Sequence, residues 1–240
     1  MGSNRGTGLE LVRQLAASPR PPQHMFATCR DATGPRGKIQ SRSSLCPADT
    51  VDLPSIRGAV QAVESHLEGQ GLNLLINNAG IGSWATLQSV DAQICSSFAV
   101  NVVGPLLVVK ESLPLLGKAV KEAGTEGLSC SRAAIINVSS KVGSIGLCLK
   151  VLEAPMYPYH ASKAALNMLT RCQSMGYREH GILCVALHPG WVQTDIGNLD
   201  RFTPPLTVDA SVGGMLKVLS SLSEKDTGTF LDWEGNAVAW

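Results

Sequence analysis

Tyr159 and Lys163 are the residues whose types and spacing are best suited to chemistry. Residues four apart on a helix share one face and lie about 6 Å apart along its axis, so the ammonium would lie beside the phenol. A useful acid near neutral pH requires the tyrosine pKa of roughly 10 to fall by roughly 3 units, or about 4 kcal/mol. One cation at that separation supplies about 3 kcal/mol at an effective dielectric constant of about 20. The pair therefore predicts a tyrosine acid that needs a second positive group, although a solvated helix face gives the same spacing.

Three short apolar runs predict buried strands, and each ends in a segment rich in polar residues or glycine. The runs are residues 72–76, 133–138 and 182–187, and they are followed by the segments 77–80, 139–140 and 188–195. Helical patterns lie between the runs, and this alternation is typical of an α/β fold. We therefore expect a doubly wound, mostly parallel sheet with helices on both faces.

The composition excludes several classes of protein. With 240 residues, a net charge of +1 and 16% charged residues, the chain has the size of one α/β domain and lacks the basic field that nucleic acid or an anionic membrane would need. Seven scattered cysteines indicate reduced thiols and neither a disulfide framework nor a metal site. No apolar run approaches the ~18 residues of a membrane span, and the polar opening does not resemble a signal peptide. We therefore expect a soluble cytoplasmic protein with no nucleic-acid, membrane or metal partner.

Gly2, Gly6 and Gly8 form a glycine-rich turn ahead of an amphipathic helix. Glycines let backbone N–H groups approach a pyrophosphate, and the N-terminus of a helix favours negative charge. A flexible N-terminal tail is the alternative interpretation of the same residues.

These segments, taken in order, resemble the short-chain dehydrogenase/reductase family. Its fingerprint Thr-Gly-x-x-x-Gly-x-Gly is matched at the three glycines, with Met1 at the Thr position, and Asn-Asn-Ala-Gly is matched at residues 77–80. The resemblance covers essentially the whole chain. Within the family, the sniffer and C-signal-factor-like carbonyl reductases are the closest branch. This branch is suggested by residues 4–6 and 188–195, by the 19-residue separation of Ser140 and Tyr159, and by Trp240.

The resemblance implies an NADP(H) site. In the family, the residue that ends the second strand meets the adenosine ribose, where an arginine can pair with the 2′-phosphate of NADP. Arg30 and Arg5 therefore indicate NADP, and the alternative for either is a solvated surface arginine. Asp49 is the candidate for the adenine contact, and its alternative role is the N-cap of the next helix. The implied coenzyme-binding residues are Gly2, Asn4, Arg5, Gly6, Gly8, Arg30, Asp49, Asn78, Ala79, Gly80, Tyr159, Lys163, Pro189, Gly190, Val192 and Thr194.

The resemblance also implies reduction of an aldehyde or ketone by NADPH. Tyr159 would give a proton to the carbonyl oxygen, which Ser140 holds. Lys163 would lower the tyrosine pKa, and Asn101 would support the proton relay. A homodimer through the helices that carry Asn101 and Tyr159 is the expected assembly. A non-catalytic NADP(H)-binding or signalling protein, or an incompletely folded truncated isoform, is the alternative.

The family has a buried strand directly ahead of the glycine-rich turn, in the middle of its sheet, and this sequence has no residues for it. The loss of about five buried apolar side chains at roughly 1.5–3 kcal/mol each costs about 8–15 kcal/mol. A typical domain is stable by only about 5–15 kcal/mol. We therefore expect residues 1–240 to form a single NADP-binding domain that is N-terminally truncated relative to the family, unless another segment fills the gap.

Overall fold

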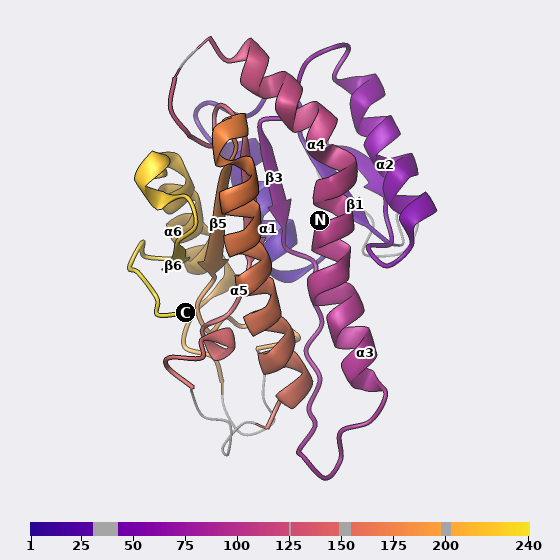
Figure 1. Cartoon of the computed structure of the whole chain (residues 1–240), viewed down its shortest axis with the longest axis vertical. Helices are drawn as coiled ribbons and strands as arrows, with labels where there is room; N and C mark the ends of the chain where they lie inside the picture. The colour runs from indigo at the N-terminus through magenta and orange to yellow at the C-terminus, as the bar shows by residue number, and fades with distance from the viewer. Residues whose placement is uncertain (31–42, 125, 149–154, 198–202) are drawn as a thin grey trace.

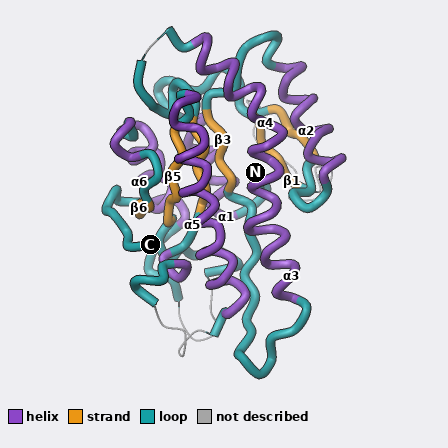
Figure 2. Tube along the Cα trace, in the orientation of Figure 1, coloured by secondary structure: helices purple, strands orange, loops and turns teal. Residues whose placement is uncertain are grey.

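Parallel strands lie between two layers of helices in the computed structural model, which describes residues 1–30, 43–124, 126–148, 155–197 and 203–240 (Figures 1 and 2). In chain order the main elements are α1 (Gly6–Ala17), β1 (Phe26–Cys29), β2 (Ser44–Pro47), α2 (Leu53–His66), β3 (Leu74–Asn77), α3 (Gln93–Phe98), α4 (Gly104–Glu122), β4 (Ala134–Val138), α5 (Tyr157–Tyr177), β5 (Leu183–His188), α6 (Val208–Ser221) and β6 (Phe230–Asp232). All paired strands run parallel. The predicted doubly wound α/β fold is confirmed.

The central strand β4 divides the core into two layers, because successive side chains of a strand point to opposite faces. Ala134, Ile136 and Val138 contact the apolar side chains of α1 and α6. Ile135 contacts those of α2 and α4 on the other face. Every residue of β4 is buried, as is typical of a strand covered by helices on both faces.

The sheet is divided into two parts between β1 and β3. Four strands pair in the order β3-β4-β5-β6, and β1 pairs with β2 separately. Within the described residues, no strand lies between the two parts, as the missing first strand led us to expect. Residues 1–3 bridge the gap at one end, since Met1 N donates to Ile76 O at 2.9 Å and Ser3 N donates to Thr28 O at 2.9 Å.

Strand β2 forms in the segment 31–50, where Gly34, Pro35 and Gly37 and a run of serines favour no regular element. It pairs with β1 in parallel, with Ala27 opposite Leu45 and Thr28 opposite Cys46. Cys46 is buried against α2, so tertiary packing outweighs a local sequence that is poor in strand signals. Residues 31–42 of this segment lie outside the described residues.

The apolar spacing of Ile94, Phe98 and Val102 favours one long helix over residues 91–118, but a π-helical turn interrupts it. This turn, Ala99–Val103, separates α3 from α4 and holds the buried Asn101. By length and composition alone, the whole stretch Ile94–Glu122 could cross a membrane. This is weak evidence for a membrane span, because the core helices of soluble proteins share these features. Here Val108, Val109 and Leu116 of α4 are buried against the sheet.

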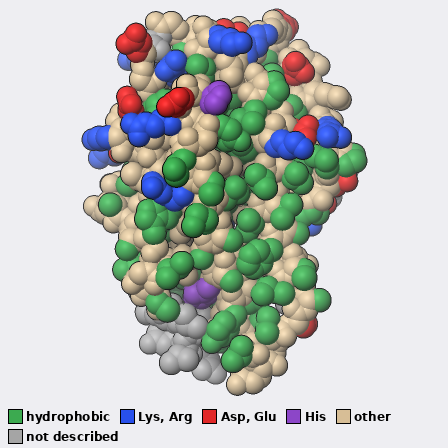
Figure 3. Space-filling model, in the orientation of Figure 1, with side chains coloured by type: hydrophobic (Ala, Val, Ile, Leu, Met, Phe, Trp, Pro, Cys, Tyr) green, Lys and Arg blue, Asp and Glu red, His purple; other side chains and the backbone are tan. Residues whose placement is uncertain are grey.

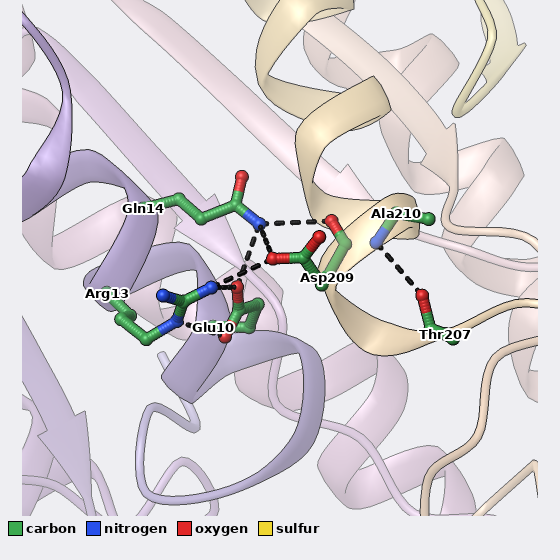
Figure 4. Close-up of polar contacts among 6 residues, drawn as sticks. All are labelled: Glu10, Arg13, Gln14, Thr207, Asp209 and Ala210. Atoms are coloured by element: carbon green, nitrogen blue, oxygen red, sulfur yellow. Dashed lines mark hydrogen bonds and ion pairs between the residues drawn. The ribbon is translucent and has the colours of Figure 1, made fainter.

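Helices α1 and α6 are joined by polar contacts on the face opposite α4 (Figure 4). Arg13 of α1 pairs with Asp209 of α6 at 2.8 Å, and Gln14 Nε2 donates to the Asp209 carbonyl at 3.0 Å. Thr207 caps α6 by accepting a hydrogen bond from Ala210 N at 3.2 Å. Because the ion pair is exposed, it contributes little stability, about 0–1 kcal/mol. The buried side chains of the two helices provide most of the attachment.

Candidate active site

Tyr159 and Ser140 come together at the carboxyl edge of the sheet. Ser140 follows β4 directly, and Tyr159 lies in the first turn of α5. The Ser140 hydroxyl lies close enough to the Tyr159 hydroxyl to lower the pKa of the phenol. The 19-residue separation in the sequence therefore does not keep the two residues apart, and residues 149–154 of their connection lie outside the described residues. Two hydroxyl groups thus share one site.

Lys163 lies one helical turn after Tyr159 and is almost completely buried, with 3% of its surface exposed. Its ammonium group donates to Val138 O at 2.8 Å and lies 5.7 Å from the centre of the Tyr159 ring. Burial lowers the pKa of Lys163 from 10.5 to about 8. The spacing argument therefore correctly placed the amine beside the phenol.

The predicted lowering of the Tyr159 pKa is not the dominant effect in this structure. Loss of water around the hydroxyl raises the pKa of Tyr159 from 10.0 to about 12, and the nearby Ser140 side chain lowers it by less. The phenolate form is disfavoured because charge is costly in a low-dielectric site. The phenol is therefore held in its protonated form, and a further positive group would be needed to make it a stronger acid.

Asn101 connects three segments around this pair. Its Oδ1 accepts from Ile81 N at 2.9 Å, and its Nδ2 donates to Ile81 O and to Ser162 Oγ, both at 2.9 Å. Ser162 Oγ in turn donates to Tyr159 O at 2.9 Å. Asn101 lies in the π-helical turn and is completely buried, with its side chain against these partners. Asn101 thus holds the segment after β3 against α5.

The glycine-rich turn lies against the segment 77–80. A Cβ atom on Gly8 would come within 2.0 Å of Gly2 O, so only glycine fits this close crossing. Gly2 has a positive φ of 70°, and a Cβ there would meet Ala79 at 2.9 Å. Asn78 Nδ2 donates to Gly2 O at 3.1 Å. Gly80 faces Asn101 and Lys163, so the turn and the catalytic candidates share one edge of the sheet.

The N-terminus of α1 has the features of an anion site. Arg5 at the N-cap position makes no side-chain cap, and the first turn has no acidic residue. The first amide groups of a helix have no partner within the helix, and the helix dipole favours negative charge there. The residues present therefore fit a phosphate group.

Arg5 itself is paired with an acidic residue. Its guanidinium contacts Asp195 at 2.7 Å, and both side chains are exposed. Thr194 lies beside Gly6, at 3.3 Å from the position of a Cβ atom there. The segment after β5 therefore lies over the start of α1, with Asn4 half-buried at the same turn. This arrangement favours Arg5 as a link between two loops.

The segment after β5 is fixed by further contacts. Pro189 O accepts a hydrogen bond from Ser211 Oγ of α6 at 2.6 Å. Val192 is buried and pairs with Leu206, so the turn through Gly190 is anchored on both sides. The predicted coenzyme residues of this segment therefore reach the same edge as Tyr159 and Lys163.

Arg30 and Asp49 lie at the far end of this edge, after the paired strands β1 and β2. Arg30 is exposed. Asp49 does not cap α2, because Asp52 does so by accepting from Ser55 N at 3.0 Å. The N-cap alternative for Asp49 is therefore wrong.

Comparison with known proteins agrees with this geometry. The family described as short chain dehydrogenase matches residues 1–202. The NADPH-bound carbonyl reductase from chicken fatty liver is 49% identical, with a TM-score of 0.93 over 100% of this chain and 96% of that chain. Carbonyl reductase Sniffer of D. melanogaster is 38% identical, with a TM-score of 0.91 over 100% of this chain and 97% of its own. C-signal of Myxococcus xanthus is 37% identical over 171 residues, which are 70% of this chain and 93% of its own.

The chain belongs to the short-chain dehydrogenase family. It is therefore an oxidoreductase with a Rossmann-like fold.

This short-chain dehydrogenase also has a buried polar network that the sequence analysis missed. Asn137 of β4 accepts from Asn77 at 2.9 Å and donates to Thr170 at 2.9 Å and Gln173 at 2.8 Å. Ser139 Oγ donates to Asn167 at 2.6 Å. The signal was present in the sequence, since Lys163, Asn167, Thr170 and Gln173 recur every three or four residues on α5. The network fixes α5, and hence Tyr159, against the end of β4.

Proposed function

We propose that this protein reduces aldehydes or ketones with NADPH. The observation that carries the proposal is the shared site of Tyr159, Ser140 and Lys163. A phenol kept protonated by burial, beside a serine hydroxyl and a buried ammonium, can donate a proton to a developing alkoxide. The carbonyl reductases of chicken and fruit fly, to which the chain is similar, support the same substrate class.

Each side chain has a separate task. Tyr159 donates its proton to the carbonyl oxygen, and Ser140 holds that oxygen by a second hydrogen bond. Lys163 stabilises negative charge on the tyrosine as the proton leaves, and it is fixed for this task by Val138 O. Asn101 positions the segment 80–81 beside them and supports the return of a proton to the site. When bound, NADPH supplies the hydride.

The glycine-rich turn and the uncapped N-terminus of α1 would hold the pyrophosphate of NADPH. Arg30 is the better candidate for the 2′-phosphate, because Arg5 is paired with Asp195. Asp49, which follows β2 in the chain, would contact the adenine. The residues Gly80, Gly190 and Thr194 would contact the nicotinamide half from both sides.

The experiment compares wild-type protein with Tyr159→Phe and with Tyr157→Phe. Tyr157 is a matched control because it lies two residues away and is exposed. NADPH oxidation is followed at saturating aldehydes and ketones, and NADPH binding is measured by fluorescence titration. We expect Tyr159→Phe to lose at least about 100-fold in turnover, a typical contribution of a positioned acid, while NADPH affinity changes less than threefold. Tyr157→Phe should retain turnover.

Two results would contradict the proposal. Equal turnover in wild-type protein and Tyr159→Phe would remove the tyrosine from the chemistry. NADPH binding without reduction of any carbonyl compound would favour a non-catalytic NADP(H)-binding protein.

We further propose a homodimer through α4 and α5. Figure 3 shows hydrophobic side chains gathered over the face that these helices present. Val103 of the π-helical turn and Leu106 of α4 are 45% and 44% exposed, and Met168 of α5 is 65% exposed. The replacement Met168→Asp should shift the sedimentation coefficient from dimer to monomer, whereas Leu87→Asp, at an exposed loop position, should not. A wild-type protein that sediments as a monomer at 50 μM or any higher concentration would refute this assembly.

A cytoplasmic location is also proposed, with residues 1–240 acting as one NADP-binding domain. The seven cysteines form no disulfide bond with one another, which fits a reducing compartment. Localisation of the tagged protein in cells tests this directly.

A further inference from the structure

We propose that Lys141 is a positioning residue for Ser140, because it fixes the turn that carries this serine to the end of β6 through Asp232. The inference rests on the proposed function, in which Ser140 holds the carbonyl oxygen. Lys141 begins the short 3₁₀ helix Lys141–Gly143, which directly follows Ser140 in the chain. It acts through the serine that precedes it and takes no part in the chemistry.

The side chain of Lys141 reaches a buried carboxylate of the sheet. Its ammonium lies 3.0 Å from Asp232 Oδ2, and the Asp232 side chain is only 5% exposed. Water and salt therefore screen this pair less than they screen an ion pair at the surface. The backbone N–H groups of Glu234 and Asn236 donate to Asp232 Oδ1 at 3.1 and 2.9 Å. These bonds hold the carboxylate in one orientation, so Lys141 has a rigid partner.

The backbone of Lys141 is fixed to the neighbouring strand. Its N–H donates to His188 Nδ1 at 3.3 Å, and His188 of β5 is the residue that pairs with Asp232 of β6. A ring nitrogen can accept this bond only when it carries no proton. Burial, and next the Lys141 ammonium, keep the ring neutral by lowering the pKa of His188 to about 3. The ion pair to Asp232 and the hydrogen bond to His188 together form the Lys141 anchor.

Helix α5 holds the two ends of the same turn through Asn167. The Oδ1 atom of Asn167 accepts from Ser139 Oγ at 2.6 Å, and its Nδ2 atom donates to Gly143 O at 3.3 Å. Two points of attachment leave a turn free to rotate about the line that joins them. Such a rotation would move the Ser140 hydroxyl. The Lys141 anchor supplies a third point, on the side of the sheet, and so opposes the rotation.

The direction of the Ser140 hydroxyl depends on the turn. Its Oγ accepts from Val142 N at 3.4 Å, within the turn itself. The same hydroxyl lies close enough to Tyr159 to lower the pKa of the phenol. A misplacement of about 1 Å can cost about 10²-fold in rate. Loss of the Lys141 anchor should therefore lower kcat, while the glycine-rich coenzyme turn, on other elements, should bind NADPH as before.

The test compares the wild-type protein with Lys141→Met, Asp232→Asn and the conservative variant Lys141→Arg. Lys141→Met removes the cation, whereas Asp232→Asn keeps the cation and removes its partner. The two variants therefore separate the anchor from a direct effect of the lysine charge. Because the Lys141 side chain is 36% exposed, its replacement leaves the core unaltered. Lys141→Met is also made in the Ser140→Ala background.

Arg57→Met is the matched control, because Arg57 forms a comparable ion pair with Glu111, at 3.2 Å, away from Ser140. The kcat is measured with saturating NADPH and the aldehyde or ketone that the wild-type protein reduces fastest. NADPH Kd is measured by fluorescence titration. Hydrogen exchange of the Val142 and Gly143 amides is followed without substrate, because these amides bond Ser140 Oγ and Ser140 O.

We expect Lys141→Met and Asp232→Asn to lower kcat at least about tenfold and to change the NADPH Kd less than about threefold. Lys141→Arg should keep at least about half of the wild-type kcat, because arginine also pairs with a carboxylate. Arg57→Met should keep the wild-type kcat. In the Ser140→Ala background, Lys141→Met should change kcat less than about twofold, because the two residues act as a unit. Exchange of the two amides should rise at least about tenfold in Lys141→Met and Asp232→Asn.

Three results would overturn the inference. Unchanged amide exchange in both variants would show that the anchor does not hold the turn. A lower kcat in Lys141→Met with the wild-type kcat in Asp232→Asn would assign the effect to the lysine charge. An equal loss of kcat from Lys141→Met with and without Ser140 would show that Lys141 does not act through the serine. A wild-type protein that reduces no carbonyl compound would instead refute the proposed function, and amide exchange would still report on the anchor.

Discussion

Replacement of Lys163 by methionine should stabilise the coenzyme-free protein while it removes the proposed activity. A charged lysine that is 3% exposed has lost its water, and burial lowers its pKa from 10.5 to about 8. A shift of 2.5 units corresponds to about 3 kcal/mol at 1.36 kcal/mol per unit. The folded protein carries this penalty whenever Lys163 is protonated.

The pKa shift of Lys163 makes the stability of the folded protein depend on pH. Between pH 8 and pH 10.5 the unfolded chain keeps the Lys163 proton and the folded chain loses it, so the wild-type stability rises with pH in this range. The methionine variant lacks this contribution but loses the hydrogen bond to Val138 O, worth about 1 kcal/mol. At pH 7 the variant should therefore be about 2 kcal/mol more stable, with a Tm about 4–8 °C higher. The difference should approach zero near pH 10.

Urea unfolding of both proteins at pH 7, 8, 9 and 10 measures this difference. Lys110→Met is the matched control, because Lys110 is an exposed residue of α4. It should change stability by less than about 0.5 kcal/mol at every pH. A difference between wild-type protein and Lys163→Met that is the same at pH 7 and pH 10 would refute the desolvation of this lysine.

Two further predictions concern buried polar groups. Asn101→Ala leaves Ile81 N and O without their partner, which should cost roughly 2–4 kcal/mol of stability and lower Tm by roughly 5–15 °C. Asn101→Asp keeps the acceptor and should lose less stability. Equal losses of stability for the two variants in a thermal melt would contradict this role of Asn101. Burial, and next the Lys141 ammonium, lower the pKa of His188 from 6.5 to about 3, so wild-type stability should fall as the pH drops from 6.5 to 3. In urea unfolding, His188→Asn should reduce the change of stability between pH 6.5 and pH 3. His180→Asn, at an exposed position, should leave that change as in the wild-type protein. An equal loss of stability in acid for all three proteins would contradict the assigned pKa.

The sequence predicted the elements whose periodicity and motifs were strong. The strands that end at Asn77 and Val138, and the helix that starts near Tyr159, were predicted within two residues of their positions. The meeting of Ser140 and Tyr159 followed from the resemblance, despite a long connection that has no readable pattern. These features depend on local sequence or on a shared motif.

Other features depend on tertiary contacts and could not be predicted in this way. Strand β2 forms because β1 offers it a partner and α2 covers Cys46. The Tyr159 pKa depends on how far surrounding atoms exclude water, which spacing alone does not report. The partner of Arg5, Asp195, is 190 residues away in the chain, so the pair emerges only from the folded structure. The gap beside β1 was expected, but its bridge through residues 1–3 was not.

Transfer of deuterium from NADPH that carries deuterium at both C4 positions of the nicotinamide tests the central claim most directly. Mass spectrometry of the alcohol formed from an aldehyde or ketone reports whether the label reaches the carbonyl carbon. With saturating labelled NADPH, we predict incorporation by the wild-type protein and by Tyr157→Phe, and at least a hundredfold slower incorporation by Tyr159→Phe. Equal incorporation rates in the two variants, or an unlabelled alcohol from the wild-type protein, would contradict the account.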